Sequence, residues 1–374
     1  MKLTSRERIL RIFRGEEIDR PALKLWGAGP VGKQLHPAYL PVSRLAAETT
    51  DIFASASSPF DIYCGANAPD YVEVTDQSTA DPLWLDRHTT FHTPAGDLHQ
   101  VERISTVGEP PYITEYLVKE PEDLPKLLSL PYAPYPFDRS EYDRLTREVG
   151  DRGVVMLNLD HAGYALQRLV GSENLAYFSI DCRDALDEVI RVFSARIREF
   201  VRMAIDAGVR GPCQWVGPEV FIPPLLSPKD FEDFVFRYDQ PLCADIHNAG
   251  GSVWVHCHGK VASFIERYIA MGVDILNPLE PPKNGDVSLP DIAAAFRGRI
   301  GLEGNIEIQQ ILQAEPDDLR EQIRACVEAG QSSGRFILCP SAGYMEYPFP
   351  SDAYIRNLLL YLTYGLECVE CCRQ

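Results

Sequence analysis

The second half of the chain alternates between long amphipathic segments and short apolar runs. From 184 to 207 apolar residues recur at the spacing of one helix face, and Gly208 ends that segment. Ser227-Pro228 is a helix start, because serine caps exposed amides and proline fits the first turn. The amphipathic segments predict helices at 184–207, 227–249, 261–271, 289–296, 316–329 and 351–364.

Short apolar runs lie between these predicted helices. They occupy 213–216, 252–256, 273–276, 299–302 and 335–338. Strands that alternate with helices require parallel β-α units. No Gly-x-Gly-x-x-Gly loop marks a dinucleotide-binding sheet. The pattern therefore favours an α/β fold of the closed (β/α)8 TIM-barrel type over an open sheet.

The first half of the chain is less regular. Thr4 and Glu7 have the spacing of a capping box, which predicts an N-terminal helix that ends at Gly15. The apolar runs 21–26 and 154–159 are expected to be further strands of the barrel.

A β element is expected to be inserted beside the barrel. Polar and apolar residues alternate over 83–104, and Pro94-Ala95-Gly96-Asp97 within this stretch is a hairpin signal. We expect a single barrel domain over 1–374, in which about 70–135 form the inserted β-hairpin element and its loops.

The composition excludes several classes of protein. Hydrophobic residues make up 45% and charged residues 24%, as in ordinary globular proteins. The net charge of −18 argues against a nucleic-acid partner, whose phosphates would be repelled. No apolar run is long enough for a membrane span, and the charged N-terminus has no signal core, so we expect a cytoplasmic protein.

The 10 cysteines are scattered along the chain. Without a secretory signal, they are expected to be reduced thiols. Cys368, Cys371 and Cys372 form a tail of thiols that we interpret as incidental, because chain ends are usually mobile.

Two histidines at the end of the 252–256 run are the sharpest chemical signal. Alternate residues of a strand share one face, so His256 and His258 are expected to point the same way and Cys257 the other. Two converging imidazoles suit zinc, which takes nitrogen, sulfur and carboxylate ligands. Cys339 and Glu219 follow other strands, and we expect these four residues to be the metal ligands.

Other polar and aromatic residues follow the predicted strands. TIM barrels place their active site at these strand ends. Glu219, Glu303 and Asn305 are candidate catalytic residues, with the two glutamates as candidate acids or bases. The residues expected to line a small-molecule substrate pocket are Trp26, His161, Tyr164, Trp215 and Tyr344.

The chain resembles the uroporphyrinogen decarboxylase superfamily over nearly its whole length. The resemblance implies a TIM barrel whose site lies inside the C-terminal mouth. The segments that carry it are Arg6-Glu7-Arg8, Gly15 to Pro21, Leu226 to Phe231, Asn248 to Gly251, His256 to Gly259, Met271 to Pro278 and Gly301 to Ile306.

Two branches of this superfamily differ in their expected site. The decarboxylases carry an arginine-rich stretch after the first strand, which holds the carboxylates of the substrate. Here Leu25-Trp26-Gly27-Ala28 follows the strand, without the arginines that usually bind carboxylates. The chain is therefore more similar to the cobamide-dependent methyltransferase branch.

That methyltransferase branch holds zinc with His-x-Cys-Gly and a later Pro-Gly-Cys. His256 matches the first ligand and His258 stands in place of the first cysteine. Ala342 stands where the later cysteine is expected, and Cys339, three residues earlier, is our own substitute for it.

The resemblance implies transfer of a methyl group between a small methylated or methoxylated compound, or a thiol, and a corrinoid protein. The chain shows no corrinoid module, so a partner protein would supply the cobamide. Two alternatives stay open, namely a metal-independent decarboxylase of uroporphyrinogen or a smaller acid, and a non-catalytic barrel that binds a ligand or a partner.

Overall fold

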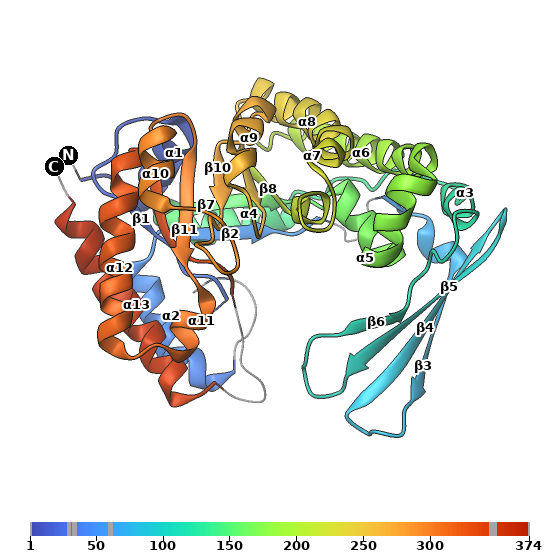
Figure 1. Ribbon diagram of the computed structural model, residues 1–374, viewed down its shortest axis with the longest axis horizontal. Helices are drawn as coiled ribbons and strands as arrows, with labels where there is room; N and C mark the ends of the chain where they lie inside the picture. Colours follow the sequence, from blue (N-terminus) through green and yellow to red (C-terminus); the bar gives the residue numbers. More distant parts are fainter. Residues whose placement is uncertain (1, 28–30, 32–35, 59–62, 344–349, 373–374) are drawn as a thin grey trace.

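Eight parallel strands form the centre of the molecule. The computed structural model describes the whole chain except residues 1, 28–30, 32–35, 59–62, 344–349 and 373–374. The strand order is β1-β12-β11-β10-β9-β8-β7-β2, so strands that follow one another along the barrel part of the chain lie side by side (Figure 1). The predicted α/β TIM-barrel class is confirmed.

The barrel strands are short. They are β1 (Ala22–Leu23), β2 (Ile52–Ala56), β7 (Gly153–Asn158), β8 (Pro212–Val216), β9 (Ser252–His256), β10 (Ile275–Asn277), β11 (Gly301–Ile306) and β12 (Phe336–Pro340).

Helices surround the barrel and connect its strands (Figure 1). The longer ones are α1 (Ser5–Arg14), α2 (Leu40–Thr49), α4 (Ser140–Val149), α5 (Ala162–Asp181), α6 (Arg183–Asp206), α8 (Arg237–Asn248), α12 (Pro316–Gly330) and α13 (Asp352–Cys371). The shorter ones are α3 (Asp123–Leu128), α7 (Pro228–Phe231), α9 (Ile265–Met271), α10 (Leu289–Ala295) and α11 (Ile308–Gln313). No helix of the described ranges is long and apolar enough to cross a membrane.

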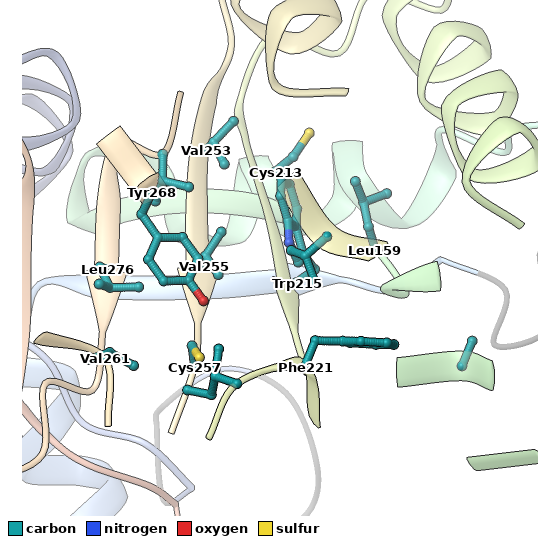
Figure 2. Close-up of a cluster of buried hydrophobic side chains, with 14 of the residues drawn as sticks. Leu159, Cys213, Trp215, Phe221, Val253, Val255, Cys257, Val261, Tyr268 and Leu276 are labelled. Carbon is teal, nitrogen blue, oxygen red and sulfur yellow. The ribbon is translucent and has the colours of Figure 1, made fainter. Parts of the chain in front are cut away.

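Alternation along the strands separates the barrel interior from the layer of helices. Trp215 of β8 and Val253 and Val255 of β9 belong to the large apolar cluster between sheet and helices (Figure 2). Gln214 and Trp254, one residue away from these, face the interior instead. This alternation decides which side chains can reach the mouth of the barrel.

Strands β1 and β2 close the barrel through a side chain. The backbone amide of Asp51 donates to the carbonyl oxygen of Leu23 at 2.8 Å. The amide of Leu23 donates in return to Oδ2 of Asp51 at 2.9 Å. The carboxylate of Asp51 also binds the buried guanidinium groups of Arg8 and Arg20, at 2.5 and 3.1 Å.

The N-terminal helix α1 packs against the barrel, and its Ile9, Ile12 and Phe13 join a buried cluster with residues of the barrel strands. The predicted capping box is present, because Thr4 and Glu7 exchange side-chain and backbone hydrogen bonds, and Gly15 ends the helix in the left-handed conformation. At the end of α1 the buried guanidinium of Arg335 donates to the carbonyl oxygens of Ile12 and Phe13, at 2.8 and 2.6 Å. Carbonyls in the last turn of a helix lack the full set of partners inside the helix, and Arg335 supplies donors to these two.

The inserted element is an antiparallel sheet that projects beside the barrel (Figure 1). Its strands are β3 (Val72–Ser78), β4 (Trp84–Thr93), β5 (Gly96–Ser105) and β6 (Tyr112–Glu115), in that spatial order. The predicted hairpin is β4–β5, in which Thr93 pairs with Gly96. The sheet lies within the predicted range 70–135, and besides the predicted hairpin it has the mostly exposed strands β3 and β6.

All ten cysteines lie in described parts of the chain, and no disulfide links them.

Replacing Asp51 by alanine is expected to destabilise the fold by about 3–5 kcal/mol, because the buried charge of Arg20 would lose its carboxylate partner and Arg8 would keep only Asp19. Asp317→Ala is the matched control, since it breaks an exposed ion pair with Arg320 and should change stability little. Urea unfolding of both variants measures the difference. Equal midpoints for the two variants would contradict the closing role of Asp51.

Candidate active site at the barrel mouth

A cavity of about 310 Å³ lies inside the C-terminal end of the barrel. Its walls come from β2, β7, β8 and β9 and from residues that follow β1, at the end of the barrel where TIM barrels bind their substrates. The lining residues are Lys24, Leu25, Trp26, Gly27, Val31, Phe53, Ser55, Met156, Asn158, Gln214, Val216 and Trp254.

A buried ion pair borders this cavity. Nζ of Lys24 donates to Oε1 of Glu303 at 2.7 Å, and the two side chains are 5% and 0% exposed. The indole nitrogen of Trp254 donates to the other carboxylate oxygen at 2.7 Å. The ammonium also lies 4.5 to 5.1 Å from the ring centres of Trp254, Phe53 and Trp26, which adds cation–π attraction. The charges of the pair cancel, so the cavity carries no net charge from it.

Glu303 fixes His256 through an asparagine. Nδ2 of Asn277 lies 3.1 Å from Oε1 of Glu303, and Oδ1 lies 2.5 Å from Nδ1 of His256. A carboxylate only accepts hydrogen bonds, so the amide nitrogen of Asn277 must face Glu303 and its oxygen must accept from His256. His256 therefore carries its proton on Nδ1 and keeps Nε2 as an acceptor. Burial and the adjacent His258 lower the pKa of His256 to about 3, which keeps the ring neutral.

His258 is held by a carboxylate in a similar way. Its Nδ1 lies 3.0 Å from Oε1 of Glu280, whose Oε2 accepts from the amide of Gly259 at 2.9 Å. Burial alone would lower the pKa of His258, but the Glu280 carboxylate raises it above its usual value. The rings of His256 and His258 meet edge to face, with centres 4.4 Å apart. The structure thus brings together the two histidines that the sequence singles out.

Glu219 lies in a turn, Pro218–Phe221, that follows β8. Its Oε2 is buried and has no hydrogen-bond partner in the described residues. Burial raises the pKa of Glu219, although the positive charges of His258 and His161 oppose the shift. The protonated acid is therefore more favoured here than in a solvated glutamate.

Cys339 lies apart from the two histidines. It faces the barrel interior from β12, fully buried in an apolar cluster with Trp254 and Ile275. Burial raises the pKa of this thiol well above its usual value, which disfavours the thiolate that a metal needs. In the ranges that the structure describes, no three histidine, cysteine or acidic side chains gather closely enough to hold a metal ion.

The other two candidate catalytic residues are on β11. Glu303 is completely buried and both of its oxygens are engaged by Lys24, Asn277 and Trp254. Asn305 is half-buried, and its backbone amide donates to the sulfur of Cys326 at 3.3 Å. Glu303 thus holds other side chains in place, rather than offering an unpaired oxygen.

The residues expected in the substrate pocket lie on two sides of the barrel sheet, some inside the barrel and some between the sheet and the helices. Trp26 lines the cavity and stacks on His256, with ring centres 4.9 Å apart. Trp215 and His161 instead line a small space between the sheet and the helices, because strand alternation turns Trp215 outward and Gln214 inward. Tyr344 lies outside the described residues.

His161 and Tyr164 shape the start of α5. Nδ1 of His161 accepts from the amide of Tyr164 at 3.2 Å and so caps this helix. Nε2 of His161 lies 3.2 Å from the carboxylate of Asp239, which raises the pKa of the ring in spite of its burial. Tyr164 packs against Gly217, where an added Cβ would lie 2.3 Å from its side chain.

Sequence reasoning missed most of the polar lining of the cavity. Lys24, Ser55, Asn158 and Gln214 line the cavity from β2, β7, β8 or just after β1, and Asn277 of β10 bonds to Glu303 beside them. The available signal was a polar residue at an inward position of an apolar strand, as at Asn158 and Gln214. Their pairings across strands are not visible in one sequence.

Comparisons with known proteins agree with this fold. The family model of uroporphyrinogen decarboxylase (URO-D) matches residues 103–348, which is more than half of the chain. A search of curated protein sequences finds no match. Among solved structures, the chain is similar to a methyltransferase from Methanosarcina mazei, with a TM-score of 0.62 and 14% identity over 98% of this chain and 99% of that chain. At this identity the similarity is one of fold.

Replacing Lys24 by methionine is expected to destabilise the protein by about 3–5 kcal/mol, because Glu303 would remain as a buried charge without its counter-ion. Adding Glu303→Gln to this variant removes that charge and should restore much of the loss. Thermal unfolding of Lys24→Met, Glu303→Gln and the double variant completes a double-mutant cycle, which measures the coupling between the two residues. A double variant that is less stable than Lys24→Met would refute the coupling.

Proposed function

Because this chain belongs to the uroporphyrinogen decarboxylase family, we propose that it is a zinc-dependent enzyme that transfers a methyl group between a small methylated compound and a corrinoid protein. The observation that carries this proposal is the pair of His256 and His258. Each ring has its Nδ1 engaged by an oxygen acceptor and its Nε2 available for a further partner.

The two imidazoles fit the donor chemistry of zinc. Zinc binds neutral imidazole nitrogens, and a ligating histidine usually donates its other N–H to a carboxylate or carbonyl oxygen. Glu280 and Asn277 are those acceptors in this chain. Glu219 is the third donor in our proposal, because its buried Oε2 has no described partner and its charge interacts with that of His258. The three described side chains are not close enough to hold a metal as they stand, so binding would require Glu219 to turn toward the two histidines. Cys339, expected earlier as a ligand, has no such support.

Zinc bound there would act as a Lewis acid on the atom that carries the methyl group, or would hold a thiol acceptor as the thiolate. The side chains of this protein would handle the protons and limit the access of water. The His258–Glu280 pair holds a proton beside His256, and the carboxyl of Glu219 would serve as the acid or base when it is not a ligand. Trp26 and Trp254 shield this chemistry from water.

The methyltransferase branch of the family has two supports. The structural neighbour from Methanosarcina mazei is named a methyltransferase and shares the fold over nearly the whole chain. The second support is that no arginine is among the described lining residues of the cavity. The corrinoid partner and the cytoplasmic location rest on the sequence resemblance and the composition.

The decarboxylase alternative is less consistent with the cavity. Lys24 is the one charged residue among the described lining residues, and Glu303 neutralises it. A substrate with many carboxylates needs cations around it, and arginine pairs are the usual solution. The cavity thus favours a small substrate without a large charge.

Elemental analysis of the purified protein tests the metal. We expect about one zinc per chain in the wild type and loss of zinc in His256→Ala and in His258→Ala. His99→Ala is the matched control, because His99 lies on the inserted sheet and bonds only to Thr90 in the described structure. Full metal-free activity in methyl transfer to a corrinoid protein would contradict the proposal.

The orienting role of Asn277 can be tested separately. Asn277→Leu removes the oxygen that holds Nδ1 of His256, and loss of such a partner typically weakens metal binding by about 10–100-fold. Competition with a zinc chelator measures this affinity. Wild-type affinity in Asn277→Leu would show that the contacts of the ring with Trp26, Trp254 and His258 orient it without Asn277.

A further inference from the structure

We propose that Ser55, Asn158 and Gln214 form the wall that recognises the substrate, and that this wall binds an uncharged planar ligand through a carboxamide or an equivalent paired donor and acceptor. We call these three residues the amide wall. The inference rests on the proposed function only in taking the mouth cavity as the substrate site.

The amide wall is built on three adjacent strands. Ser55 is on β2, Asn158 on β7 and Gln214 on β8, and all three line the mouth cavity. Register places Asn158 beside Gln214 in the ladder between β7 and β8. Nε2 of Gln214 lies 2.7 Å from Oγ of Ser55 and 3.2 Å from Oδ1 of Asn158. The Gln214 residue is 9% exposed, so most of its side chain is buried.

A count of hydrogen bonds leaves part of the wall unpaired. The two hydrogens on the Gln214 amide nitrogen are used by Ser55 and Asn158, so its oxygen and the Asn158 amide nitrogen remain. If both amides are turned over, the unpaired groups become the Gln214 nitrogen and the Asn158 oxygen. In either orientation the wall offers one amide carbonyl and one amide N–H to a ligand.

The electrostatics of the cavity restrict the ligand further. The ammonium of Lys24 is compensated by Glu303, whose two oxygens are both engaged. A charged ligand would bring a charge without a partner into a mostly buried space, which is costly. A neutral ligand avoids this desolvation penalty, and it can pair with the amide carbonyl and the amide N–H that Asn158 and Gln214 leave unpaired.

The remaining walls favour a flat ligand. Trp26, Phe53 and Trp254 present aromatic rings to the same cavity, and such rings bury planar groups well. A cavity of about 310 Å³ is at the small end of ligand sites. The ligand class is therefore a small planar molecule with one donor and one acceptor side by side.

Isothermal titration of the full chain with three probes of similar shape tests the wall. Benzamide has both a donor and an acceptor, acetophenone lacks the donor, and benzoate is charged. We expect benzamide to bind at least about tenfold more tightly than either, the equivalent of one good hydrogen bond. Equal binding of the three probes, or no benzamide binding, would overturn the inference.

Variants connect this binding to the amide wall. Gln214→Leu should reduce benzamide affinity by about tenfold or more. Gln322→Leu should not, because Gln322 pairs with Gln310 in α11, away from the cavity. Should Gln214→Leu fail to fold, Gln214→Glu keeps the shape and adds a charge, and it should lose benzamide binding as well. Unchanged affinity in the folded Gln214 variant would refute the role of the wall.

The zinc content of these variants separates the two proposals. Gln214 touches neither histidine, so Gln214→Leu should keep the wild-type zinc content. A protein without zinc that still prefers benzamide would refute the methyltransferase proposal and leave the recognition wall standing.

Discussion

The carboxylate of Glu303 is the constraint on which the barrel interior depends. A completely buried carboxylate is stable only when its oxygens are satisfied, and here an ammonium, an indole N–H and an amide supply the donors. These donors come from β9, β10 and the residue that follows β1, so one side chain on β11 ties together the ends of several strands at the mouth. The same network decides which nitrogen of His256 carries the proton. The site is thereby organised before any ligand arrives.

The sequence predicted those features that depend on local patterns. Alternation of apolar runs with amphipathic segments gave the barrel, and the capping box at Thr4 and Glu7 gave α1. The spacing of His256 and His258 placed two rings on one face of a strand, because side chains alternate there. The hairpin signal located β4 and β5, whereas the exposed, polar β3 gave no apolar signal.

Features that depend on partners far away in the chain were not predictable. Lys24 and Glu303 are 279 positions apart, and Gln214 and Ser55 are 159 apart, so their contacts arise from barrel register. Trp215 was expected at the mouth, but which face of a strand is inner depends on tertiary packing. Cys339 was chosen as a ligand for its softness, and its burial among apolar side chains was not visible in the sequence.

The closure between β1 and β2 has a consequence for the motions of the mouth. Seven of the eight joints in the barrel are ladders, but the joint at Asp51 consists of one backbone bond and one side-chain bond. Partial unfolding begins where backbone pairing is sparse. The joint between Leu23 and Asp51 is thus a seam, that is, the most weakly paired joint of the barrel. The segment that carries Lys24 and Trp26 into the cavity starts beside this seam. Ligand entry by loosening this seam would leave the other seven joints intact.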